Sequence, residues 1–208
     1  MNLWIGAFLS YLIGAIPTAY IFGKLYKGID IRKHGSGNVG ATNVFRVLGK
    51  WPGIIVLVLD IIKGIIPVVF IADILGLTEI FYRIILALCV VSGHNWTIFL
   101  NFKGGKGIAT TLGVLIGFTI KIESIRIVLF TIVLVWGVCL LLSGIVSLSS
   151  MVAAVLLPII MVVTNQPFEI IGLGVISCLF IIIRHKPNIK RLLAGQEPVV
   201  PILFRKKK

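Results

Sequence analysis

The segment GSGNVGATN, residues 35–43, combines glycines with side-chain hydrogen-bonding groups beside basic residues. We expect Gly35, Gly37 and Gly40 to take positive φ and to let a ligand approach the main chain closely. The polar side chains are those of Ser36, Asn38, Thr42 and Asn43, and the flanking positive charges are those of Arg32, Lys33 and Arg46. The segment therefore predicts a loop that binds an anion, with an ordinary tight turn as the alternative.

A second glycine-rich segment, FKGGKGIAT at residues 102–110, lies between two apolar runs. Its glycines and cations are Lys103, Gly104, Gly105, Lys106 and Gly107. They precede a helix that we expect to begin near Ile108, whose free N–H groups and positive dipole end attract anions. The spacing differs from the nucleotide-binding pattern G-x-x-x-x-G-K-[ST], so the segment predicts a site for a small phosphate group rather than nucleotide hydrolysis.

A third polar segment, RHKPNIKRLLAGQE at residues 184–197, follows the last apolar run. His185 titrates near neutral pH, and Asn188 can orient a ligand. Phosphate can be neutralised by Arg184, Lys186, Lys190 and Arg191. Glu197 is interpreted as a partner for one of these cations, and the alternative for the whole segment is a membrane-surface anchor.

Other polar residues lie inside or between the apolar runs. Asp60 and Lys63 are three residues apart and share a helical face, which predicts an ion pair more readily than a direct role in a site. His94 and Asn95 are interpreted first as hydrogen-bonding groups between helices. Ser143 and Ser147 either line the same cavity as the loops or cap helix ends.

The composition indicates an integral membrane protein of the all-α class. The chain of 208 residues is 58% hydrophobic, its mean hydropathy is +1.11, and we expect one domain over residues 1–208. Seven apolar runs predict a compact bundle of seven transmembrane helices at about residues 3–23, 52–72, 80–100, 108–120, 126–142, 148–164 and 168–183. The fourth run is short enough to end at a polar cavity or to fail to span.

The distribution of basic residues predicts the N-terminus outside and the C-terminus in the cytoplasm. With seven spans, the inner segments hold sixteen Lys and Arg residues, including the run Arg205 to Lys208 that we interpret as a membrane anchor, whereas the outer segments hold Arg83, Lys121 and Arg126. Both glycine loops then face the cytoplasm. The net charge of +13 is explained by this topology and the anionic inner leaflet, and we expect no nucleic-acid partner.

Several chemistries are disfavoured by missing motifs. The sequence has no G-x-S-x-G, no H-E-x-x-H, no clustered carboxylates, and no His followed five positions later by Asp. Cys89, Cys139 and Cys178 fall inside apolar runs without metal-ligand spacing, so core packing is expected. We expect a membrane enzyme with phosphate sites, no metal and no cofactor.

These segments resemble the bacterial acyl-phosphate:glycerol-3-phosphate acyltransferase family. The resemblance rests on GSGNVGATN with Arg46 and the following LGK, on DIIKG at residues 60–64, on GHNWTIFLNFKGGKGIAT at residues 93–110, and on RHKPNIKRLLAGQE, in the family's order. It extends over essentially the whole chain. Trp96 departs from the Pro expected in many relatives.

The resemblance implies transfer of an acyl group from acyl phosphate to the sn-1 hydroxyl of glycerol 3-phosphate, giving lysophosphatidic acid and phosphate in phospholipid synthesis. It implies a multi-pass protein of the bacterial inner membrane, in contact with membrane lipid, with an acyl-phosphate synthase as a candidate upstream partner. It places glycerol 3-phosphate at the GGKG loop. The alternatives are a transporter of phosphate-bearing anions and a lipid phosphatase.

The site residues follow from the segments and the resemblance together. The candidate catalytic residues are Ser36, Arg46, Lys106, His185 and Asn188. The candidate substrate-binding residues are Gly37, Asn38, Thr42, Asn43, Lys103, Gly104, Gly105, Gly107, Ser143 and Ser147. The proton of the attacking hydroxyl goes either to His185 or to a substrate phosphate oxygen. Because acyl phosphate is already activated, no acyl-enzyme is required.

Overall fold

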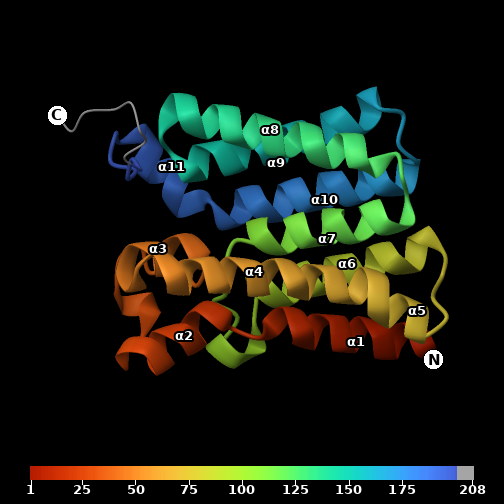
Figure 1. Cartoon of the computed structure of the whole chain (residues 1–208), viewed down its shortest axis with the longest axis horizontal. Helices are drawn as coiled ribbons and strands as arrows, with labels where there is room; N and C mark the ends of the chain where they lie inside the picture. The colour runs from red at the N-terminus through yellow and green to blue at the C-terminus, as the bar shows by residue number, and fades with distance from the viewer. Residues whose placement is uncertain (201–208) are drawn as a thin grey trace. The chain divides into compact units, whose positions relative to one another are not determined.

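The computed structural model describes residues 1–200, and within that range all regular elements are helices (Figure 1). The all-α class predicted from the apolar runs is confirmed. The chain divides into two compact units, Met1–Glu123 (unit 1) and Ser124–Lys208 (unit 2). A single domain over the whole chain stays a prediction, and the basic run at 205–208 lies outside the described residues.

Unit 1 begins with a helix that is broken by a proline. Helix α1 spans Asn2–Ala15 and α2 spans Thr18–Lys27. Pro17 has no N–H and disfavours helical geometry at the residue before it, and Ile16 accordingly has φ −55° and ψ 113°. At the break, the Ile16 carbonyl accepts the Thr18 N–H at 3.0 Å, and the carbonyl oxygens of Ala15 and Ile16 also accept hydrogen bonds from side chains of other segments.

The chain then forms the first glycine loop and a long apolar rod. A 3₁₀ turn, η1 (Ile31–Lys33), leads into the loop, and α3 (Ala41–Leu48) follows it. The rod consists of α4 (Lys50–Ile66), the π-helical turn η2 (Pro67–Ile71) and α5 (Ala72–Ile74).

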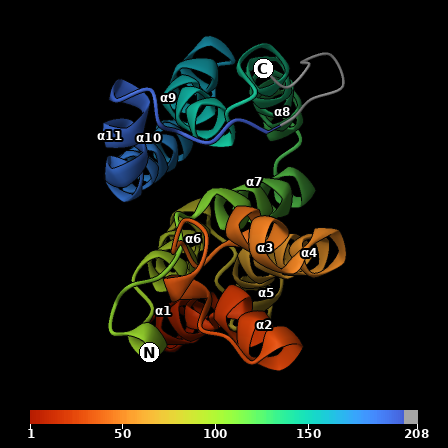
Figure 2. The ribbon, with the colours of Figure 1, turned by 90° about the vertical axis from the view of Figure 1, so that its left-hand side faces the viewer.

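Two further helices carry the second glycine loop between them. Helix α6 spans Ile80–Asn95, the 3₁₀ turn η3 spans Ile98–Leu100, and α7 spans Ile108–Lys121. Helix α6 packs on α1 and α7 packs on α4, as the view along the helices shows (Figure 2). A Cβ on Gly93 would meet the main chain of α1, and one on Gly64 would meet that of α7. These glycines permit close helix packing, as small residues do in membrane bundles.

In its described part, residues 124–200, unit 2 is built on three long helices and a short one. They are α8 (Ile125–Ser143), α9 (Val146–Val163), α10 (Phe168–Arg184) and α11 (Lys186–Leu193). Helix α9 packs against both α8 and α10 (Figure 2). The chain bends by 60° between α10 and α11. The segment after α11 returns to the α8–α9 turn, where Val200 N–H donates to the Gly144 carbonyl at 2.8 Å.

The helices agree with the predicted apolar runs, and length separates them into two groups. Five helical stretches within the described residues are long and apolar enough to cross a membrane: Asn2–Lys27, Lys50–Ile74, Ile80–Leu100, Ile125–Ser143 and Val146–Val163. The bent pair α10–α11 makes a sixth if it is counted as one span. Helix α7 has 14 residues and is shorter. The count of seven spans and the orientation stay predictions.

Candidate functional site

The first glycine loop takes the expected backbone shape at two of its three glycines. Gly35 has φ 61° and Gly37 has φ 70°, in the left-handed region that favours glycine. The expectation for Gly40 was wrong, because its φ is −157°. Gly40 is extended backbone at the start of α3, where its carbonyl accepts the N–H groups of Asn43 and Val44.

Asn43 holds this loop together from within. Its Oδ1 accepts the N–H of Ser36 at 2.8 Å, and its Nδ2 donates to the carbonyl oxygens of Ile31 at 3.2 Å and His34 at 3.0 Å. The side chain is buried. Sequence reasoning assigned Asn43 to substrate orientation, whereas these contacts show a side chain committed to the loop's own backbone. Asn43 would therefore affect a bound ligand indirectly, by fixing the backbone at Ser36 and its neighbours.

Exposed polar groups surround the loop and the first turns of α3. Ser36, Thr42 and Arg46 are exposed, and Asn38 is half-buried. Thr42 and Arg46 are four residues apart and share one face of α3, opposite the buried Val44. The first N–H groups of α3 have no acceptor within the helix and add to this positive surface.

Arg32, which we expected to contribute charge to the loop, is paired with Asp30. Its Nε lies 3.0 Å from Asp30 Oδ1, and its Nη2 lies 2.7 Å from Oδ2. The hydrogen bonds from Arg32 hold the pKa of Asp30 at about 2, below the ordinary value of 3.8. The sequence indicated a positive charge at Arg32 but did not show that Asp30 neutralises it.

The second glycine loop is held by the end of α6. Gly104 N–H donates to the Asn95 carbonyl at 3.2 Å, and Gly105 N–H donates to the His94 carbonyl at 2.9 Å. A Cβ on Gly104 would overlap the His94 carbonyl oxygen, and one on Gly105 would overlap the His94 imidazole. These two glycines are therefore required by the protein's own packing, which differs from the expected reason of ligand approach.

Helix α7 begins at Ile108, as predicted, and Gly107 precedes it with φ 81°. Lys106 is half-buried and Lys103 is exposed. The Asn95 amide lies against Gly107, since a Cβ there would come within 2.8 Å of Asn95 Oδ1. Within residues 1–200, the buried Asn95 amide and the hydroxyls of Thr110 and Thr111 have no hydrogen-bond partner. Sequence reasoning placed Asn95 between helices and did not connect it with this loop.

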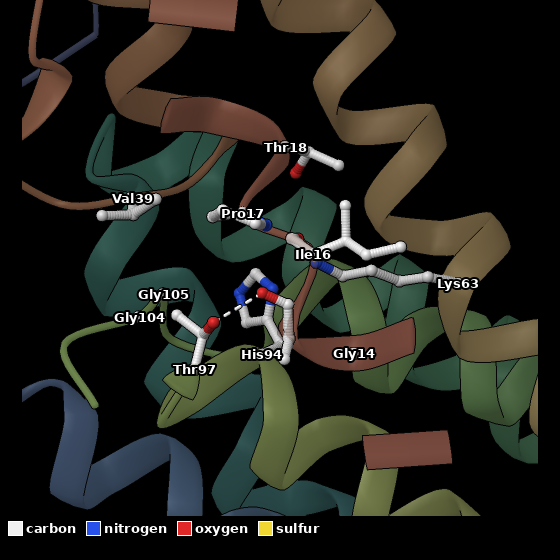
Figure 3. A pocket seen from close by; sticks show the side chains of 11 residues that line it. Gly14, Ile16, Pro17, Thr18, Val39, Lys63, His94, Thr97, Gly104 and Gly105 are labelled. Carbon is white, nitrogen blue, oxygen red and sulfur yellow. Dashed lines mark hydrogen bonds between the residues drawn. The ribbon is translucent and has the colours of Figure 1, made fainter. Parts of the chain in front are cut away.

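The two glycine loops meet in unit 1. A Cβ on Gly105 would come within 2.8 Å of the Val39 carbonyl oxygen, so the first loop lies against the second. A cavity of about 10 Å³ opens beneath this contact, and Figure 3 shows the side chains around it. It is lined by Gly14, Ala15, Ile16, Pro17, Thr18, Val39, Lys63, His94, Thr97, Gly104 and Gly105. Such a volume accommodates about one water molecule.

His185 stands at the bend between α10 and α11 in unit 2. Its side chain is 1% exposed, and Nδ1 lies 2.8 Å from the Ile181 carbonyl oxygen. A carbonyl oxygen only accepts hydrogen bonds, so Nδ1 carries a proton. In the neutral form of the ring, Nε2 is then the nitrogen without a proton.

Glu197 joins three polar residues of unit 2. Its Oε1 accepts hydrogen bonds from Asn188 Nδ2 at 2.5 Å and from Ser147 Oγ at 2.7 Å, and its Oε2 lies 2.7 Å from Arg191 Nε. The predicted pairing of Glu197 with a cation is confirmed. Burial raises the pKa of this carboxyl, but the hydrogen bonds from Ser147, Arg191 and Asn188 outweigh it and keep the pKa below the ordinary value.

The serines near the α8–α9 turn have different roles. Ser143 Oγ donates to the Cys139 carbonyl at 2.7 Å and accepts the Ile145 N–H at 3.1 Å. Its hydroxyl therefore bonds within the last turn of α8 and to the turn that follows, whereas Ser147 joins the Glu197 cluster. Of the candidate catalytic residues, unit 1 carries Ser36, Arg46 and Lys106, and unit 2 carries His185 and Asn188.

Comparison with known proteins assigns the chain to a family. Residues 4–195 match the family model described as glycerol-3-phosphate acyltransferase. The chain is 42% identical over 196 residues to glycerol-3-phosphate acyltransferase 2 of Moorella thermoacetica, covering 94% of this chain and 96% of the relative. It is 43% identical over 191 residues to the glycerol-3-phosphate acyltransferase of Fusobacterium nucleatum, covering 91% and 93%.

Two solved structures agree with this assignment. Both are crystal structures of PlsY (YgiH), an integral membrane glycerol 3-phosphate acyltransferase, and both are 36% identical to this chain. The glycerol 3-phosphate form has a TM-score of 0.88 and covers 99% of this chain and 100% of its own. The lysophosphatidic acid form has a TM-score of 0.84, with coverages of 96% and 95%. The chain belongs to the glycerol-3-phosphate acyltransferase family, whose members are integral membrane proteins of phospholipid synthesis.

Proposed function

We propose that the protein transfers an acyl group from acyl phosphate to the sn-1 hydroxyl of glycerol 3-phosphate and releases inorganic phosphate. The observation that carries the proposal is the meeting of two glycine loops, each of which opens the N-terminus of a helix. Two adjoining anion loops suit a reaction in which both substrates carry phosphate. The related PlsY was crystallised in glycerol 3-phosphate and lysophosphatidic acid forms.

The two loops take different substrates in this proposal. The Gly104–Gly107 loop, with Lys106 and the N-terminus of α7, holds the phosphate of glycerol 3-phosphate. The first loop, with Ser36, Thr42 and Arg46, holds the phosphate of the acyl donor. The assignment of His185 and Asn188 as catalytic residues stays a prediction from the sequence.

The reaction needs no covalent enzyme intermediate. The sn-1 hydroxyl oxygen attacks the carbonyl carbon of acyl phosphate, the new ester bond forms, and the bond from that carbon to the phosphate oxygen breaks. The hydroxyl proton passes to an oxygen of the departing phosphate or to His185. Positioning of the two substrates and neutralisation of their charge supply the catalysis.

We also propose that the chain crosses the bacterial inner membrane seven times, with the N-terminus outside and both glycine loops at the cytoplasmic face. The asymmetry of basic residues supports this orientation. Single cysteines would be placed near Lys33, Lys186 and Glu79 in a variant without native cysteines. In intact cells, an impermeant thiol reagent should label the site near Glu79 and spare the other two. Labelling near Lys33 would overturn the topology.

An assay of the purified protein tests the choice of donor. Acyl phosphate and acyl-CoA are supplied in turn, with and without glycerol 3-phosphate, and the positional isomer of the product is determined by NMR. We expect sn-1 lysophosphatidic acid with acyl phosphate alone as donor. Transfer from acyl-CoA at a similar rate, or release of free fatty acid in place of the ester, would contradict the proposal.

Mass spectrometry of the intact protein tests the direct attack. Acyl phosphate is supplied without acceptor, and no acylated protein should accumulate, because the donor is already activated. A stoichiometric acyl adduct that glycerol 3-phosphate discharges would overturn this mechanism. Activity should also survive treatment with EDTA.

A further inference from the structure

A buried ion pair in unit 1 lies next to the second glycine loop and is not used by the proposed chemistry. Asp60 Oδ1 is 2.7 Å from Lys63 Nζ, and the two side chains are 2% and 6% exposed. The same oxygen accepts a hydrogen bond from Thr18 Oγ1 at 2.6 Å. The pairing predicted from sequence is confirmed. Charges inside a membrane span are costly, so a pair kept there suggests a task beyond filling the core.

Lys63 ties this pair to the proline break between α1 and α2. Its Nζ donates to the Ile16 carbonyl at 3.3 Å. The neighbouring Ala15 carbonyl accepts a hydrogen bond from Thr97 Oγ1 at 2.5 Å. The Ile16 carbonyl also accepts the Thr18 N–H at 3.0 Å. Side chains from α4 and from the segment leading into the second loop therefore hold the Pro17 break from two sides.

His94 connects the pair to the loop itself. Its Nδ1 lies 3.9 Å from Asp60 Oδ1, and its carbonyl accepts the Gly105 N–H at 2.9 Å. The imidazole fills the space that a Cβ on Gly105 would need. Figure 3 shows the His94 ring in the same pocket as Lys63 and Thr97, with Gly104 and Gly105 beside it.

The space among these groups is too small for a substrate. The cavity of about 10 Å³ that Lys63, His94 and Gly105 line has room for about one water molecule. A phosphate group therefore does not reach Asp60 or Lys63 through it. Asp60 and Lys63 would therefore affect a bound ligand only through the second glycine loop.

We propose that Asp60, Lys63 and His94 are positioning residues that hold the Gly104–Gly107 loop in the shape that binds the phosphate of glycerol 3-phosphate. The inference rests on the proposed function only in assigning that phosphate to this loop. The ion pair orients His94 and the proline break, and His94 in turn supports Gly105 by a backbone hydrogen bond and by packing.

Charge-neutral substitution separates positioning from stability. Asp60→Asn and Lys63→Met each leave one buried charge without its partner and should lower the melting temperature in detergent. The double variant removes both charges and should recover the melting temperature. It should still raise KM for glycerol 3-phosphate by about ten- to a hundredfold, because the contacts that orient the loop are gone. KM for acyl phosphate should remain near the wild-type value.

His94→Ala provides a second measurement if the double variant fails to fold. It leaves the Asp60–Lys63 pair intact and should raise KM for glycerol 3-phosphate with little change in melting temperature. Asp73→Asn is the matched control, because Asp73 of α5 pairs with Arg83 and with Lys121, the last residue of α7 and hence at the end of that helix away from the loop. It should affect stability and leave KM unchanged.

Two results would overturn the inference. One is a wild-type KM for glycerol 3-phosphate in His94→Ala and in every folded ion-pair variant, and the other is an equal rise of KM in Asp73→Asn. Lys106→Ala in the same assay tests the phosphate assignment separately. If Lys106→Ala impairs use of glycerol 3-phosphate and the network variants do not, the inference fails while the proposed function stands. If Lys106→Ala has no effect, the phosphate assignment fails.

Discussion

The two glycine loops of unit 1 have similar compositions and are stabilised in opposite ways. The first is braced from within, by three hydrogen bonds of the Asn43 side chain to backbone groups within twelve residues of it. The second is braced from outside, by the main chain and the imidazole at the end of α6 and, through them, by Asp60 on α4. Substrate binding by the first loop should therefore be sensitive to substitutions within the loop. Substrate binding by the second loop should also be sensitive to substitutions in the other helices that support it.

The glycines themselves reflect this difference. Gly35 and Gly37 are needed for positive φ. Gly104 and Gly105 are needed because other parts of unit 1 occupy the space of a side chain. The same residue type therefore serves backbone conformation in one loop and packing in the other.

The largest effect is expected for Lys106→Ala in the second loop. Lys106 brings a cation to the N-terminus of α7, so its removal should lower kcat/KM for glycerol 3-phosphate by about a thousandfold. Membrane insertion and the melting temperature should be retained. Steady-state kinetics of the purified variant provide the measurement. Near-normal transfer by a well-expressed variant would remove Lys106 from the site.

A smaller but still large effect is expected for Gly105→Leu. The new side chain would overlap the His94 ring and displace the loop, which should raise KM for glycerol 3-phosphate by about a hundredfold. Gly137→Leu is the matched control, since a Cβ at Gly137 meets nothing within 4 Å. An unaltered substrate-saturation curve for Gly105→Leu would show that outside bracing of this loop is unimportant.

Asn43→Ala tests the internal bracing of the first loop. The variant leaves the Ser36 N–H and two carbonyl groups without their partner, and we expect about a tenfold loss of kcat/KM for acyl phosphate. Asn43→Asp keeps the acceptor for the Ser36 N–H and should lose less. Kinetics with each substrate varied in turn would distinguish the loops. If Asn43→Ala acts on glycerol 3-phosphate alone, the assignment of substrates to loops is reversed.

The smallest effect is expected from the titration of Glu197 in unit 2. Its hydrogen bonds from Ser147, Arg191 and Asn188 keep its folded-state pKa below the ordinary 4.5. A lowered pKa means that the carboxylate contributes stability above pH 4.5 and loses it as the pH falls through the folded-state value. Melting temperatures of wild type and Glu197→Gln should therefore differ at pH 7 and converge under more acidic conditions. A constant difference down to pH 3 would contradict this.

Local sequence was sufficient to indicate the membrane class, the helical runs, both glycine loops, the start of α7 and the family. These features depend on composition and spacing along the chain, which apolar periodicity and glycine placement record directly. The ion pairs of Asp60 with Lys63 and of Glu197 with a cation were also predictable, because each pair lies within one short segment.

The roles of the individual loop residues depend instead on the three-dimensional arrangement. Three of these roles follow from how the chain turns in space. Gly40 has extended backbone, Arg32 forms an ion pair with Asp30, and the Asn43 side chain bonds to the backbone of its own loop. Other contacts join segments that helix packing brings together. His94 packs against Gly105, and Lys63 donates a hydrogen bond to the Ile16 carbonyl. Composition and spacing along one chain do not encode which helix faces meet, so these contacts required the tertiary structure.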